Sequence, residues 1–124
     1  MIKNALIVIS FILGIKFGVE YLFSPKFQVY GDTTKAPWTC QVNNTIGHLM
    51  MVVSHYEEAM AFFEKSIKRC PDTPMCEVGE FEVAECLTKL NRYREATVAY
   101  KLYTEKYPGT QRAKIAERAA QIIQ

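Results

Sequence analysis

The sequence predicts an all-α protein, in which one apolar helix precedes a domain of stacked helices. The segment from Ala5 to Phe23 is strongly apolar. Further along, apolar residues recur three and four positions apart, the spacing of a helix that buries one face. This pattern also repeats after 37 residues. We therefore expect a transmembrane anchor over 1–23, an extended linker over 24–39 and a helical domain over 40–124.

Residues 5–23 are predicted to form a single transmembrane helix, because 19 residues approach the roughly 20 that cross a bilayer. The alternative is a cleaved signal peptide, since Lys3 precedes the apolar run. No small-x-small cleavage site follows that run, and apolar residues resume after Lys16, which favours retention of the segment. A short basic N-terminal segment usually stays cytoplasmic. We expect an inner (cytoplasmic) membrane protein with its C-terminal domain on the exported (periplasmic) side.

Two charged residues interrupt the apolar segment. Lys16 and Glu20 are four positions apart, so they share one face of a helix and can pair. Either both lie near the membrane interface, with Lys16 extending toward water, or they contact another membrane subunit.

The predicted linker has no helical period and contains Pro25, Gly31 and Pro37. Trp38, the only tryptophan of the chain, stands at its end. An indole ring serves both as a packing group and as an anchor for a partner or an interface, and both readings of Trp38 stay open.

The domain consists of two related units and a final helix. Each unit carries two helical stripes, with Ser54 or Asn91 at the turn and Pro71 or Pro108 where the second helix must stop. A fifth stripe follows, up to Ile123. A shift of 37 pairs residues of like character: Ile46 with Val83, Gly47 with Ala84, Met50 with Leu87, Tyr56 with Tyr93, Ala59 with Ala96, Phe63 with Tyr100.

These residues resemble the tetratricopeptide repeat (TPR) pattern, W-x2-L-G-x2-Y followed by A-x3-F and P. The large first residue is absent from both units, and the period exceeds the usual 34 because the loop 71–75 is longer. The resemblance implies a short α-solenoid of two helical hairpins and a C-terminal capping helix, with small residues at 47, 59, 84 and 96 where helices cross closely. A generic helical bundle is the alternative.

In this family the first helices of the hairpins line a concave groove that holds a peptide or a helix of a partner. The resemblance implies that Asn44, His48, Met51, Phe81, Glu85 and Thr88 form this groove here. Phe81 is the expected anchor, because exposed aromatic residues often dominate binding. The alternatives are a core position for Phe81 and a merely solvated side chain for His48.

Of the four cysteines, the hairpin arrangement gathers Cys40, Cys70 and Cys76 at one end of the domain. Cys86 lies about 15 Å along the third helix from Cys76, beyond the reach of a disulfide. An exported domain favours a disulfide. We predict the bond Cys70–Cys76, with Cys40–Cys70 second, and a buried apolar role for Cys86.

Charge and motifs argue against other classes of protein. The net charge is +2 and no basic stripe is present, so nucleic acid is not an expected partner. The sequence lacks zinc and haem cysteine spacings, HExxH, a phosphate loop and a nucleophile elbow. We therefore expect no enzyme activity, cofactor or metal. A thiol-redox role for Cys70 and Cys76 is disfavoured, because they lack the C-x-x-C spacing.

These observations predict a membrane-tethered scaffold for protein–protein interaction. It would be an accessory subunit of a larger membrane protein complex, bound to membrane-embedded protein subunits and to the bilayer through residues 5–23. The alternative is a transient assembly factor or tethered chaperone that binds client peptides in the groove. Stable co-purification at fixed stoichiometry would distinguish the two.

Overall fold

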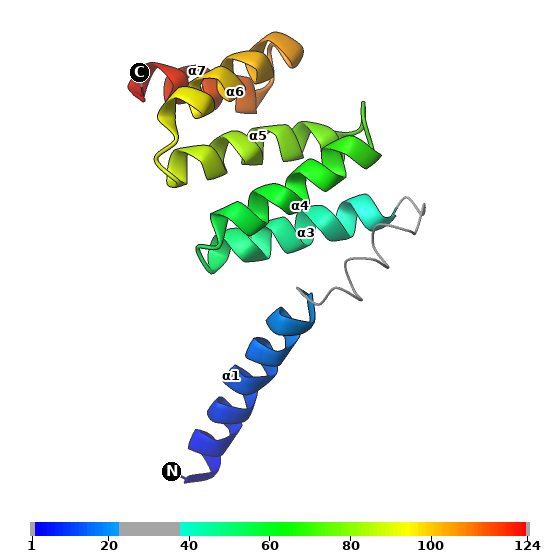
Figure 1. The fold of residues 1–124 in the computed structure, drawn as a ribbon, viewed down its shortest axis with the longest axis vertical. Coiled ribbons are helices and arrows are strands. Elements are labelled where there is room, and N and C mark those ends of the chain that lie inside the picture. Colours follow the sequence, from blue (N-terminus) through cyan, green and yellow to red (C-terminus); the bar gives the residue numbers. More distant parts are fainter. Residues whose placement is uncertain (1, 23–37, 124) are drawn as a thin grey trace. The chain divides into compact units, whose positions relative to one another are not determined.

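The computed structural model describes residues 2–22 and 38–123, and all regular structure in these ranges is helical (Figure 1). The helices are α1 (Ile2–Leu22), α3 (Trp38–Val52), α4 (Tyr56–Arg69), α5 (Pro74–Lys89), α6 (Tyr93–Lys106) and α7 (Gln111–Ile122). The predicted all-α class is confirmed. The chain divides into two units, 1–36 and 37–124. Most of the predicted linker lies outside the described residues.

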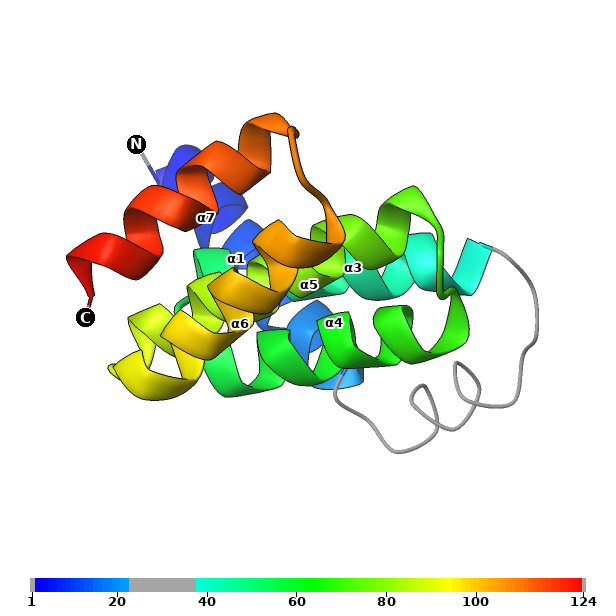
Figure 2. The same cartoon turned by 90° about the horizontal axis from the view of Figure 1, so that it is seen from above.

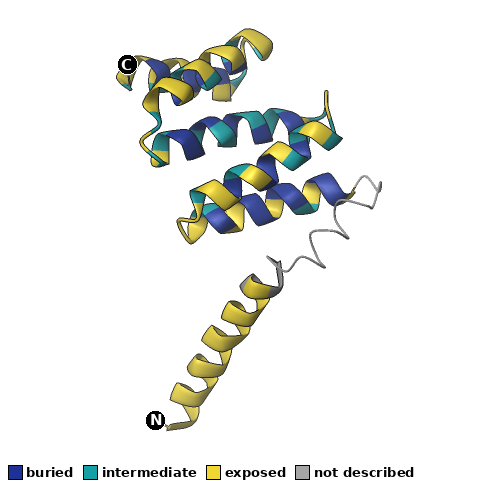
Figure 3. Cartoon of the chain, viewed as in Figure 1, coloured by how far each residue is buried: buried dark blue, intermediate teal, exposed yellow. Residues whose placement is uncertain are grey.

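Helix α1 exposes every side chain that is described along it (Figure 3). Its exposed apolar residues cover all sides of the helix rather than one stripe, and include Leu6, Ile9, Phe11 and Phe17. An apolar helix without a polar face is a surface that something else must cover.

The predicted transmembrane span is not confirmed. In the described parts of the chain, no helix combines the length and the apolar character that crossing a membrane requires.

In the unit 37–124, each helix packs against the one before it (Figures 1 and 2). Helices α3 and α4 form one hairpin, α5 and α6 form a second, and α7 packs on α6. Helix α3 also contacts α5. The predicted order of two hairpins and a final helix is therefore the order observed.

The 37-residue repeat extends to the backbone conformation. Ser54 and Asn91 turn the two hairpins with φ of 62° and 60°, in the left-handed region that few residues adopt. The loops after the hairpins do the same, with φ of 60° at Asp72 and 81° at Gly109. Equivalent positions thus adopt equivalent turns, as expected of a structural repeat.

Helices α5 and α7 also begin in the same way, at threonines 37 residues apart. The Thr73 hydroxyl accepts a hydrogen bond from the Cys76 N–H, and the Thr110 hydroxyl accepts one from the Ala113 N–H. Such N-caps typically contribute about 1 kcal/mol. These caps were not among the features predicted from the sequence, although a threonine before Pro74 is a recognisable start signal.

The core confirms that small residues are needed where helices cross. Ala59, Ala84 and Ala96 are fully buried. A Cβ atom added at Gly47 would lie 2.8 Å from the Phe63 ring, closer than real Cβ contacts. A cluster of buried residues joins α5, α6 and α7 and consists of Phe81, Ala84, Leu87, Ala96, Tyr100, Tyr103, Ala113, Ala116 and Ala120.

Gly47→Ala is expected to destabilise the domain by about 1–3 kcal/mol, because the new methyl group overpacks the Phe63 ring. Thermal unfolding of Gly47→Ala, Phe63→Leu and the double variant forms the measurement. The double variant should lose less stability than the sum of the single changes, because leucine makes room for the methyl group. Additive losses would contradict the close contact.

The disulfide joins Cys40 to Cys70, whose Cα atoms are 6.4 Å apart, and the first-choice prediction of Cys70–Cys76 is wrong. Cys40 lies in the first turn of α3 and Cys70 ends α4, so the bond closes the first hairpin. Cys76 instead lies buried in α5, where its Sγ is 3.9 Å from the Tyr107 hydroxyl. Cys86 is a buried free thiol, as predicted.

Candidate functional site

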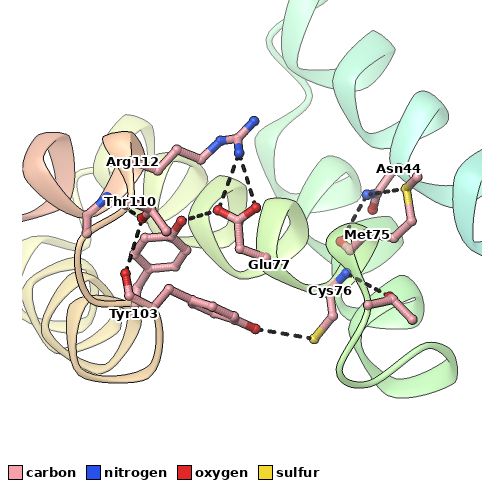
Figure 4. Close-up of polar contacts among 10 residues, drawn as sticks. Asn44, Met75, Cys76, Glu77, Tyr103, Thr110 and Arg112 are labelled. Atoms are coloured by element: carbon pink, nitrogen blue, oxygen red, sulfur yellow. Dashed lines mark hydrogen bonds and ion pairs between the residues drawn. The ribbon is translucent and has the colours of Figure 1, made fainter.

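Two residues predicted to line the groove are part of the interior. Asn44 is 5% exposed and Phe81 is 8% exposed. The Asn44 amide donates a hydrogen bond to the Met75 carbonyl oxygen at the start of α5, over 3.1 Å (Figure 4). The assignment of Asn44 and Phe81 to an exposed surface is therefore wrong.

The reason lies in how the first helices pack. Phe81 is the repeat equivalent of Asn44, and its ring contacts those of Tyr100 and Tyr103 at 6.1 and 5.5 Å. Alanines of α7 belong to the same cluster. The face that carries positions 44 and 81 is thus covered by the following helices, α5 in one case and α6 with α7 in the other. The spacing of apolar residues predicts a helix, but it does not show which face of that helix the neighbouring helices cover.

Another part of the predicted surface comes together as a polar cluster. The His48 Nδ1 atom of α3 lies 3.9 Å from a carboxylate oxygen of Glu82 on α5. The Tyr100 hydroxyl donates a hydrogen bond to Glu85, one turn further along α5, over 3.1 Å. We call His48, Glu82 and Glu85 the α3–α5 polar cluster. Glu82 was not among the predicted site residues.

The remaining predicted residues have mixed surroundings. Met51 and Thr88 are half-buried, and the Thr88 hydroxyl donates to the Ala84 carbonyl oxygen within its own helix. The Thr88 hydroxyl also lies 3.4 Å from that of Tyr100. Trp38 is the first residue of α3 and is 47% exposed. On α1, Lys16 and Glu20 are both exposed.

The cluster keeps a carboxylate in an unfavourable position. The Glu82 side chain is 17% exposed. Burial raises the pKa of its carboxyl group above the ordinary 4.5, and the nearby Glu85 raises it further, whereas His48 and Arg112 act in the opposite direction. A partner that supplies a positive charge or a hydrogen-bond donor would therefore be attracted here.

Glu82→Gln is expected to raise the melting temperature at pH 7 and to leave it unchanged well below pH 4.5. Because the folded pKa is raised, the folded state binds this proton more tightly than the unfolded state. The ionised carboxylate therefore opposes folding, and this cost appears as pH rises through the folded pKa. Melting curves of both proteins across this range test it, and a lower melting temperature of Glu82→Gln at pH 7 would contradict it.

A second polar network holds α5, α6 and α7 together (Figure 4). The Tyr103 hydroxyl donates a hydrogen bond to Glu77, and Arg112 of α7 pairs with the same carboxylate at 3.1 Å. Burial and the hydrogen bond to Glu77 raise the pKa of Tyr103 to about 12. Its groups satisfy one another, so the network fastens the last helix rather than offering a site.

A groove of about 210 Å³ lies on another face, between α4, α5 and α6. Its walls include the apolar side chains of Ile67, Val83 and Leu102. Lys106 and Glu80 form an ion pair of 2.8 Å at its edge. The second oxygen of Glu80, Oε2, is buried without a hydrogen-bond partner among the described residues.

The described side chains offer neither a metal site nor a reactive thiol at Cys86. Among the described residues, no three histidine, cysteine or acidic side chains are placed to hold a metal ion. Burial raises the pKa of the Cys86 thiol to about 12, with a further contribution from Glu82 and Glu85, so Cys86 stays protonated at neutral pH.

The fold and the cluster together define a protein of stacked helical hairpins with a polar surface across its first two hairpins. No protein-family model matches the chain, and comparisons with curated proteins and with solved structures found no match.

Proposed function

We propose that this protein is a membrane-tethered scaffold that binds other protein subunits, as an accessory part of a larger membrane protein complex. The observation that carries the proposal is the contrast between its two units. Helix α1 exposes apolar side chains on all sides, whereas the unit 37–124 buries its own core and leaves charged groups at its surface. One unit suits attachment, and the other suits recognition.

Helix α1 is the proposed anchor in the lipid bilayer. Covering its exposed leucine, isoleucine and phenylalanine side chains with lipid lowers the free energy, because it removes apolar surface from water. The long side chains of Lys16 and Glu20 would extend to the interface or meet another membrane-embedded subunit. The proposed location is the inner (cytoplasmic) membrane.

The proposed side for the unit 37–124 is the exported, periplasmic one. The disulfide between Cys40 and Cys70 supports this proposal. Disulfides persist in oxidising compartments and are rare in the cytosol.

The helical unit is proposed to be a short array of tetratricopeptide type. The repeated turns at Ser54 and Asn91 support it, and so does the close approach of Gly47 to Phe63. The α3–α5 polar cluster is its proposed contact with a partner segment. Its two glutamates favour a segment that carries a lysine or an arginine.

Alkaline extraction of membranes that contain the full chain tests the anchor. The chain is expected to stay with the membrane, and a variant with Leu13→Asp and Phe17→Asp should be released. Both replaced residues are exposed on α1, so the folded unit is unaffected. Release of the unaltered chain would contradict membrane anchoring.

Purification in mild detergent, followed by mass spectrometry, tests the scaffold. A partner subunit should co-purify at fixed stoichiometry, and Glu82→Lys should remove it. Glu105→Lys, on the exposed surface of α6, is the matched control with the same change of charge. Equal retention in both variants would place the partner elsewhere, and substoichiometric, variable partners would favour the assembly factor or chaperone.

A further inference from the structure

The outer face of α3 differs from an ordinary protein surface. No aspartate, glutamate, lysine or arginine occurs between Trp38 and Val53. Leu49 is 50% exposed, Val52 is 81% exposed, and Val53, just beyond the helix, is 45% exposed. We call Leu49, Val52 and Val53 the α3 apolar face. Contiguous exposed apolar residues of this kind mark interaction sites more often than isolated ones do.

The internal repeat allows positions on α3 to be compared with the equivalent positions on α5. A shift of 37 places Val42 on Gly79 and Leu49 on Cys86. In α5 both positions are buried, with Cys86 at 0% exposure. A Cβ at Gly79 would lie 3.1 Å from Ile67 of α4, and Cys86 lies two turns along the same face. In α5 this face is therefore covered by α4, the second helix of the preceding hairpin.

The first and last helices of the stack, α3 and α7, differ in the charged residues that they carry. Terminal helices of repeat arrays need a polar outer face. Helix α7 exposes the charged Lys114 and Arg118, alongside the apolar Ile115 and Ile122. Helix α3 carries no charged residue and presents Leu49 at the position where α5 has the buried Cys86.

We propose that the α3 apolar face is a second docking surface, which takes one amphipathic helix of a partner protein, packed on α3 as α4 packs on α5. The contacting stripe of that helix is aliphatic or aromatic and carries no charge, because α3 offers no charged group to pair with one. This surface goes beyond the proposed function, because it uses residues outside the α3–α5 polar cluster.

Site-specific crosslinking in the full, membrane-bound chain tests this inference. The probe is a photoreactive benzophenone side chain placed at position 49 and, separately, at 53. A third protein carries it at position 98, where the native Val98 is 58% exposed on α6. Mass spectrometry of the crosslinked peptides then identifies the residues reached.

Positions 49 and 53 are expected to crosslink to residues three or four apart in a single segment of another protein, and position 98 should not reach that segment. In a Leu49→Glu background, the crosslink from position 53 should fall at least tenfold, with an unchanged melting temperature. Crosslinks to lipid, to a second copy or to this chain's own residues would overturn the proposal, and so would none at all. Glu82→Lys should leave the crosslink intact, so the docking surface and the polar cluster can fail separately.

Discussion

Phe81→Ala is expected to destabilise the unit 37–124 by about 3–5 kcal/mol, because it removes a buried ring from the main core. The ring is 8% exposed and touches the rings of Tyr100 and Tyr103. In a domain of this size, such a loss lowers the melting temperature by at least about 12 °C. Circular dichroism during heating measures it.

The matched control is Val98→Ala, which shortens an exposed side chain on α6 and should change the melting temperature little. The same experiment separates the two hypotheses for Phe81. A Phe81→Ala protein that melts at an unchanged temperature but no longer binds its partner would support the predicted position of Phe81 in the concave groove. A protein that loses both would be consistent with the core position.

Removing the disulfide is expected to cost about 3–4 kcal/mol. Cys40 and Cys70 are separated by 30 residues, and a cross-link of this span restricts the unfolded chain by that amount in the chain-entropy account. The double variant Cys40→Ala and Cys70→Ala should therefore unfold at a lower urea concentration than the oxidised protein.

A reductant provides the control for this measurement. It should destabilise the unaltered protein and leave the double variant unchanged, because the free Cys76 and Cys86 form no bond. Equal stability of the oxidised and the reduced protein would show that the bond contributes nothing. A new bond from Cys76 in a Cys40→Ala protein would show that Cys76 can leave its buried position in α5.

The helical hairpins were predictable because their signals are local. Apolar residues three and four positions apart mark a helix wherever they lie in space. Ser54 and Asn91 lie at the turns, and the close contact of Gly47 with Phe63 confirms that position 47 must be small. The threonine caps at positions 73 and 110 could have been predicted in the same way, because a cap involves only its own first turn.

The candidate site was harder to predict because it depends on contacts between helices. Glu82 and His48 belong to different hairpins, and nothing in the local pattern of either shows that their side chains lie 3.9 Å apart. The choice of disulfide has the same origin. Cys76 is closer to Cys70 in sequence, but α5 directs it into its own packing, whereas Cys40 stands beside Cys70 across the hairpin.

The sequence by itself determined which segments are helical, where the hairpins turn and which crossings need small residues. These depend on the order of residues along a few turns of chain. The tertiary structure decided which face of each helix is covered. Phe81 and Leu49 are both apolar residues on first helices, yet Phe81 is buried and Leu49 is half exposed. The difference arises because a helix in a stack is buried only where a neighbour lies against it. Among residues 38–123, no helix lies against α3 in the way that α4 lies against α5.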